Sequence, residues 1–168
     1  MFEAGDDAAV RVVLGARELR RYAGRAYLLP ALADPPAQLR REWDGKRAWP
    51  LPELGGTLRF ARRQGAGLAC ARVREAGLSL RLRQGGEKLR LQAKGSTRSL
   101  KNLLQEARLP PWVRERLPLI YCADTLVAVP DLGVASGWEA GADEAGWLYC
   151  HPGICKRSSD TTARIIVI

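Results

Sequence analysis

The sequence predicts an α+β protein built from short strands and a few short helices. Residues 57–63, 78–83 and 88–92 alternate apolar side chains with polar or basic ones, as half-buried strands do. Leucines within residues 100–107 recur at helical spacing. Prolines and glycines interrupt the chain so often that none of these elements can be long.

Residues 1–76 are expected to form a β-rich linker, or part of a substrate-binding region. The apolar runs at 10–14 and 26–32 are predicted strands, joined by a polar, arginine-rich connection. A short helix is expected over 38–43, and the prolines that follow favour extended backbone. Residues 69–74 alternate apolar with basic side chains and are predicted to form a further strand.

A second unit is predicted over residues 77–147. The segments 78–83 and 88–92 are expected to form strands on either side of the sequence Gln-Gly-Gly. Gly85 and Gly86 fit a hairpin turn, because such turns require positive φ angles that glycine adopts without strain.

Helices and a final strand pair are predicted in the rest of this unit. Ser96 or Ser99 is a suitable N-cap for a helix over 100–107, which ends before a Pro-Pro pair. A second short helix fits 111–117, because proline is well tolerated in the first helical turn. Residues 119–129 then form two apolar runs joined at Ala-Asp, which predicts a strand pair.

The charge of the chain is concentrated in one segment. The whole sequence has 27 Lys and Arg against 18 Asp and Glu, a net charge of +9. Ten of these basic residues lie between Arg81 and Arg116 with three acidic ones, whereas residues 117–150 contain five acidic residues and no basic one. Cations on rigid elements suit a polyanion such as a nucleic acid. The alternative is a solvated basic face that belongs to a structural or interaction domain and recognises no specific RNA.

Three motifs in this region point to a known family. They are RLRQGGEKLRL, then SLKNLLQEARLPPWVRERLPLIY, then TLVAVPDLGV, and their order and spacing resemble the C-terminal domain of tRNA(Ile)-lysidine synthases. The resemblance is close over residues 78–138 and weaker over 11–76. It implies a layered β-sandwich with short helices, similar to a module of phenylalanyl-tRNA synthetase beta chains, with a tRNA-binding domain at 77–147 and an atypical tail at 148–168.

The resemblance also implies a partner and a set of contacts. Members of the family attach lysine to C2 of the wobble cytidine of tRNA(Ile) with the help of ATP, and their C-terminal domain holds the tRNA. A homodimer of the parent enzyme is compatible with this role. The tRNA contacts carried over to this chain are Arg83, Lys88, Arg98, Lys101, Arg114 and Arg116. Trp112 is a further candidate that would stack on a base, although packing in the core is the favoured interpretation.

Catalysis is not expected from this chain by itself. The family's ATP site uses a Ser-Gly-Gly-x-Asp-Ser loop whose amides hold pyrophosphate, and no such loop is present here. We therefore expect no catalytic residue and no cofactor in this chain, with ATP and lysine used by a catalytic domain outside it. A zinc site built from Cys122, Cys150, His151 and Cys155 is the weaker alternative, because the ligand spacing is poor.

The sequence also indicates where the protein is located and which part of its tail is ordered. The longest apolar runs fall well short of the roughly 20 residues that cross a bilayer, and the N-terminus lacks the pattern of a signal peptide. The sequence therefore predicts a cytoplasmic protein with no membrane partner and with free thiols. The only ordered part expected in the tail is its last segment, ARIIVI, as an added strand.

Overall fold

The computed structural model describes residues 10–31, 33–150 and 166–167, which fall into two compact units. Unit 1 comprises residues 1–34 with 159–168, and unit 2 comprises residues 35–158. Within the described residues, no helix is long and apolar enough to cross a membrane.

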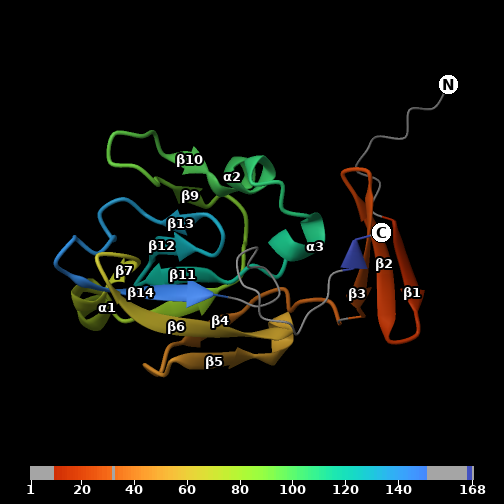
Figure 1. Ribbon diagram of the computed structural model, residues 1–168, viewed down its shortest axis with the longest axis horizontal. Helices are drawn as coiled ribbons and strands as arrows, with labels where there is room; N and C mark the ends of the chain where they lie inside the picture. The colour runs from red at the N-terminus through yellow and green to blue at the C-terminus, as the bar shows by residue number, and fades with distance from the viewer. Residues whose placement is uncertain (1–9, 32, 151–165, 168) are drawn as a thin grey trace. The chain divides into compact units, whose positions relative to one another are not determined.

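Unit 1 is an antiparallel sheet with the strand order β1-β2-β3-β15 (Figure 1). Its strands are β1 (Arg11–Leu14), β2 (Arg17–Tyr22), β3 (Arg25–Pro30) and β15 (Ile166–Val167). The stretch predicted as a polar connection therefore contains a strand, which alternation alone did not reveal. Glu18 of β2 is 4% exposed and accepts hydrogen bonds from Nε of Arg11 and Arg20, each at 2.8 Å. These two cations make a buried carboxylate tolerable at this position in the sheet.

The added strand expected in the segment ARIIVI is confirmed. Ile166 and Val167 pair antiparallel with Leu28 and Tyr27 of β3. The zinc alternative cannot be followed in the same way, because His151 and Cys155 lie outside the described residues. No group of three or more metal-ligating side chains occurs in the part of the chain that the structure describes.

Unit 2 contains a five-stranded sheet, a four-stranded sheet and a two-stranded sheet, with orders β13-β12-β11-β8-β4, β5-β6-β14-β7 and β10-β9. Its strands before the turn at Gly85 and Gly86 are β4 (Arg40–Glu42), β5 (Ala48–Leu51), β6 (Gly56–Gln64), β7 (Leu68–Ala69) and β8 (Ser79–Arg81). The later strands are β9 (Lys88–Leu89), β10 (Arg98–Ser99), β11 (Leu119–Cys122), β12 (Thr125–Val129), β13 (Gly133–Val134) and β14 (Ala145–Cys150). Helical elements are η1 (Pro52–Leu54), α1 (Cys70–Ala76), α2 (Leu100–Glu106) and α3 (Pro111–Arg114).

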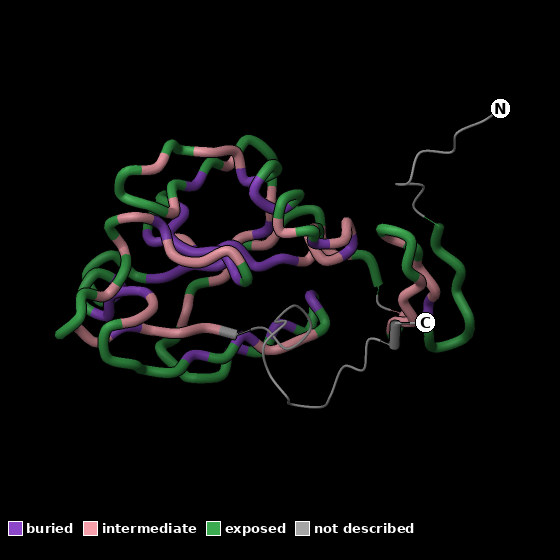
Figure 2. Tube along the Cα trace, turned by 45° about the horizontal axis from the view of Figure 1, so that its top comes forward, coloured by how far each residue is buried: buried purple, intermediate pink, exposed green. Residues whose placement is uncertain are grey.

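Two hydrophobic clusters lie on opposite faces of the five-stranded sheet. On β11, Ile120 belongs to the cluster shared with the four-stranded sheet, which includes Phe60 of β6. The neighbouring Leu119 belongs to the cluster under α2, which includes Leu104. Successive strand residues point to opposite faces, so this one strand serves both clusters. Figure 2 shows the buried segments of unit 2 gathered along these central strands. The α+β class predicted from the sequence is confirmed, with mostly antiparallel sheets and short helices.

Helix α2 agrees with the sequence prediction. It spans Leu100–Glu106, and the Ser99 hydroxyl accepts a hydrogen bond from the Asn102 amide at 3.2 Å, so Ser99 is its N-cap. Helix α3 begins at Pro111 as expected but ends at Arg114, three residues earlier than predicted. The strand pair predicted in 119–129 is confirmed as β11 and β12.

Two element types were predicted wrongly. The helix expected over 38–43 is the edge strand β4, because Arg41 pairs with Leu80 of β8 and sheet pairing outweighs local propensity. The strand expected over 69–74 is helix α1, whose Cys70 and Val73 are buried one helical turn apart. Alternation in so short a segment fits either period.

The strands on either side of the Gln-Gly-Gly turn do not form a hairpin. β8 pairs with β4 and β11, whereas β9 pairs with β10. Gly85 and Gly86 nevertheless have φ angles of 94° and 84°, as a tight turn needs. The domain division at 1–76, 77–147 and 148–168 stays a prediction, and its first boundary falls inside unit 2, between α1 and β8.

Candidate nucleic-acid interface

The basic segment, residues 81–116, extends from the end of β8 through β9, β10 and α2 to just past α3. Two of its predicted contacts, Lys88 and Lys101, are exposed. Lys88 of β9 pairs with Ser99 of β10, the residue that caps α2, so Lys101 follows two residues later in the first turn of the helix. The neighbour of Lys88, Leu89, is 2% exposed and faces the core. Lys88 therefore points away from the core, because strand side chains alternate.

Neither lysine forms an ion pair with a described residue, which distinguishes them from Arg81, Arg83 and Arg98, each of which faces a carboxylate. Arg98, for example, makes a bidentate ion pair with Glu106, one bond of which is 2.8 Å long. The hydrogen bond from Arg98 lowers the pKa of the Glu106 carboxyl, so this pair is charged at neutral pH. The predicted contact at Arg98 therefore carries a counter-charge of its own.

Arg83 and Glu87 face each other across the glycine turn, as their spacing suggests, with 3.7 Å between Nε and Oε2. The other oxygen of Glu87 accepts hydrogen bonds from the backbone amides of Gln84 at 2.5 Å and Gly85 at 3.0 Å. The amides that a phosphate would need are thus already bound by a carboxylate. The turn has a structural role, and its two glycines have the positive φ angles expected from the sequence, although the turn does not close the predicted hairpin.

The contacts predicted around α3 are partly buried. Arg114 donates from Nε to the Leu109 carbonyl oxygen at 2.5 Å, and both Arg114 and Arg116 are half-buried. Trp112 is 9% exposed. Its burial agrees with the favoured interpretation as a core residue and leaves little ring surface for a base.

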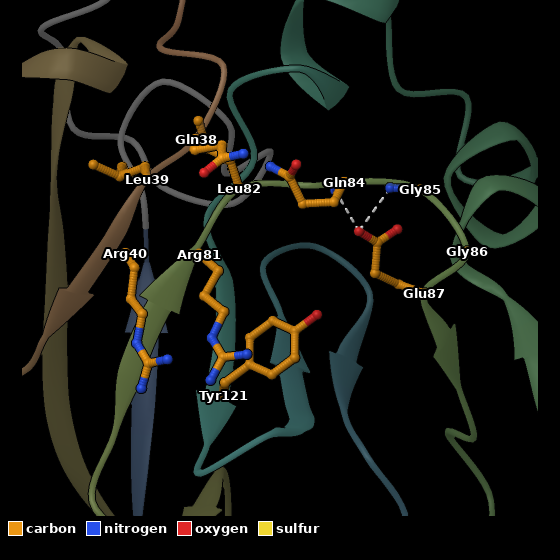
Figure 3. Close-up of a pocket in the computed structure, with 10 residues that line it drawn as sticks. All are labelled: Gln38, Leu39, Arg40, Arg81, Leu82, Gln84, Gly85, Gly86, Glu87 and Tyr121. Carbon is orange, nitrogen blue, oxygen red and sulfur yellow. Dashed lines mark hydrogen bonds between the residues drawn. The ribbon is translucent and has the colours of Figure 1, made fainter.

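A cleft of about 610 Å³ lies beside β8, and it brings together residues that sequence reasoning did not connect. Figure 3 shows Arg40 and Arg81 side by side along one wall, the ring of Tyr121 against Arg81, and the turn at Gln84 to Glu87 on the other side. The full lining is Gln38, Leu39, Arg40, Arg81, Leu82, Gln84, Gly85, Gly86, Glu87 and Tyr121. The register of three strands builds this site, since Arg81 pairs with Arg40 of β4 and β8 pairs with β11.

Arg81 is fixed in this cleft by three contacts. Its Nη2 donates to the Ala123 carbonyl oxygen at 2.6 Å and to Oδ1 of Asp124 at 2.8 Å. Its guanidinium carbon lies 4.4 Å from the centre of the Tyr121 ring, within the range of a cation–π contact. The sequence identified Arg81 as one of a charge cluster, but no sequence signal related it to Tyr121, which lies forty residues later on another strand.

Comparison with known proteins agrees with the resemblance found in the sequence. Residues 78–151 match the domain family described as the TilS substrate C-terminal domain. The tRNA(Ile)-lysidine synthase of Coxiella burnetii is 38% identical over 130 residues, which is 77% of this chain and 29% of that protein. The same-named protein of Chromobacterium violaceum is 40% identical over 152 residues, which is 89% of this chain and 33% of its own length.

A solved structure supports the fold. A crystal structure of a TilS C-terminal domain superimposes with a TM-score of 0.54 at 24% identity, covering 72% of this chain and 99% of that one. The chain spans about a third of the length of the curated relatives it matches. The expected match to the C-terminal portion of this family is therefore confirmed.

Proposed function

We propose that this chain, which belongs to the tRNA(Ile)-lysidine synthase family through its C-terminal domain, binds tRNA and holds tRNA(Ile) for lysidine formation. The observation that carries the proposal is the pair of exposed lysines on β9 and α2, Lys88 and Lys101, without a carboxylate partner among the described residues. Cations of this kind gain most from a phosphate, because they do not first have to break an ion pair. Arg83 and Arg98 contribute less in this proposal, since each faces a glutamate.

The proposal assigns no chemical step to this chain. The ligation of lysine with ATP is the activity expected from the family, and the Ser-Gly-Gly-x-Asp-Ser loop that it needs does not occur in the sequence. We therefore expect the isolated chain to bind tRNA without consuming ATP. A cytoplasmic location and a homodimer of the parent enzyme are further parts of the proposal.

Gel-shift titration of the full chain with tRNA(Ile) tests this function. The double variant Lys88→Ala/Lys101→Ala is expected to bind more weakly, and the slope of log K against log salt is expected to fall by about 2, roughly one for each phosphate contact. An unstructured RNA of equal length is expected to bind less tightly than the tRNA to the unaltered chain.

Lys46→Ala is the matched control for each lysine. It removes one positive charge from an exposed lysine of the same unit, but Lys46 lies outside the basic segment and pairs with Asp44 at 2.9 Å. Its salt slope is expected to match that of the unaltered chain. Equal binding of both RNAs, or an unchanged slope in the double variant, would favour the incidental basic face instead.

A further inference from the structure

One wall of the cleft beside β8 is formed by the planar guanidinium of Arg81, which is held in one position by its neighbours. A free arginine side chain loses rotamer freedom when it binds a ligand, but Arg81 is already held by the Ala123 carbonyl, by Asp124 and by the Tyr121 ring. Only 22% of its side chain is exposed. The guanidinium and the aromatic ring together form a fixed stack that lines the cleft.

The position of this stack in the sheet explains why it is accessible. Arg81 and Tyr121 lie on the face of the five-stranded sheet that also bears Leu119, because they alternate with Leu80 and Ile120, which face the other sheet. Over Leu119 that face is covered by the cluster under α2. Towards the edge strand β4 the sheet face opens into the cleft instead.

The stack in the cleft suits a flat ligand, and the charges around it suit one anionic group. Arg40 is directly opposite Arg81 in the strand register, and its side chain is 63% exposed. Glu42 lies 3.2 Å from Nε of Arg40, and Asp124 offsets Arg81. Because both arginines have a counter-charge, the site attracts one phosphate only moderately and relies on stacking for the rest.

The opposite wall provides polar groups for the edge of a base. The Gln84 side chain is held in place by its donation to the Ala37 carbonyl oxygen at 3.1 Å, and Gln38 lies beside it. Burial raises the pKa of the Tyr121 hydroxyl, and the nearby Glu87 adds to this effect, so the phenol stays protonated and can donate a hydrogen bond. The volume of about 610 Å³ falls in the range of small-ligand clefts.

We infer that this cleft binds one unpaired nucleotide of an RNA, whose base stacks on the Arg81–Tyr121 pair while its phosphate contacts Arg40. Stacking of splayed bases on aromatic rings and arginine planes is the usual way in which proteins hold unpaired RNA. The inference rests on the proposed function, since it assigns a separate site for an unpaired nucleotide to a chain whose exposed lysines hold phosphates.

The test uses the full chain and a single-stranded RNA of five nucleotides with 2-aminopurine at its centre. Stacking on the Arg81–Tyr121 pair is expected to quench the fluorescence of this base as the protein is added. Arg81→Lys keeps the charge but removes the plane, and it is expected to weaken binding by about tenfold and to abolish most of the quenching. Tyr121→Leu is expected to reduce the quenching in the same way.

Arg63→Lys is the matched control, because Arg63 is exposed on β6 of the other sheet and is not part of the cleft. Tryptophan emission and circular dichroism establish that each variant is folded, and Tyr121→Leu provides an independent variant if Arg81→Lys does not fold. Absence of quenching at saturation in the unaltered chain, or equal affinity and quenching in Arg81→Lys and Arg63→Lys, overturns the inference.

The outcome is separable from that of the proposed function. Lys88→Ala/Lys101→Ala is expected to weaken binding of tRNA and to leave the quenching of the short RNA unchanged. If the chain fails to prefer tRNA but quenches the short RNA through Arg81, the cleft stands and the tRNA function fails. If tRNA binds in a salt-dependent way and the short RNA is not quenched, the tRNA function stands and the cleft assignment fails.

Discussion

Gly146 of β14 is a position where a single added methyl group is expected to destabilise unit 2. β14 is an inner strand of its sheet, and Gly146 pairs with Arg63 of β6 on one side and Ala69 of β7 on the other. A Cβ atom at Gly146 would overlap the Ala66 carbonyl oxygen and would lie 2.8 Å from the Ala140 Cβ. Since the first obstacle is backbone, the clash can be relieved only by moving the strand or the turn next to it.

The cost of Gly146→Ala follows from these two contacts. Overpacking in a well-packed site costs about 1–3 kcal/mol, and an obstacle of backbone puts this substitution near the upper end. The lower entropy of alanine in the unfolded chain returns about 0.4–1 kcal/mol. A net loss of about 2 kcal/mol in the free energy of unfolding is therefore expected, with Gly141→Ala as the control. The atom nearest to a Cβ at Gly141 is 3.9 Å away, so this variant is expected to be as stable as the unaltered chain or, through the same entropy effect, up to about 1 kcal/mol more stable.

Urea unfolding followed by tryptophan emission measures this difference in the correct unit. The five tryptophans of the sequence all lie between residues 43 and 147, so the signal reports unit 2 and not the sheet of unit 1. With a denaturant dependence of about 1–3 kcal/mol per M, the midpoint of Gly146→Ala is expected to fall by about 1 M. If the midpoints of Gly146→Ala and Gly141→Ala agree within about 0.3 M, the close packing described for β14 is wrong.

Two further predictions concern a helix cap and a buried thiol. Ser99→Ala is expected to lower the free energy of unfolding by about 1 kcal/mol, because the Asn102 amide loses its acceptor, whereas Ser96→Ala should have little effect; the same urea titration compares them. Burial raises the pKa of the Cys122 thiol from 9.0 to about 11. Since the folded-state pKa is the higher one, the stabilisation is complete below pH 9 and is lost as the pH rises towards 11, by up to about 2 kcal/mol. Urea titrations across this pH range should show a fall in the free energy of unfolding of the unaltered chain and a smaller fall in Cys122→Ala. Identical pH profiles would contradict a raised pKa of the Cys122 thiol.

Elements with a strong local signal were predicted correctly. Helix α2 has leucines at helical spacing, a serine cap before it and a Pro-Pro pair after it, and all of these act within a few residues. The pair of β11 and β12 is similarly local, because a two-residue turn joins two apolar runs. The stretches at 38–43 and 69–74 carry no such signals, and their conformations depend on the strands against which they pack.

Part of the candidate site could be predicted from the sequence and part could not. The exposure of Lys88 and Lys101 follows from strand alternation and helical spacing, so these two could be selected from the sequence. The ion pair between Arg98 and Glu106 spans eight residues and depends on how β10 leads into α2, which the spacing alone did not reveal.

By itself, the sequence determined the α+β class, the family of the C-terminal domain and the concentration of positive charge between β8 and α3. Only the tertiary structure decided which of those cations are already paired, and only strand register placed Arg40, Arg81 and Tyr121 around one cleft. The physical reason is that periodicity, caps and turns act between near neighbours in the chain. Pairing between strands that are forty residues apart is selected by the packing of the whole sheet, and a local pattern contains no record of it.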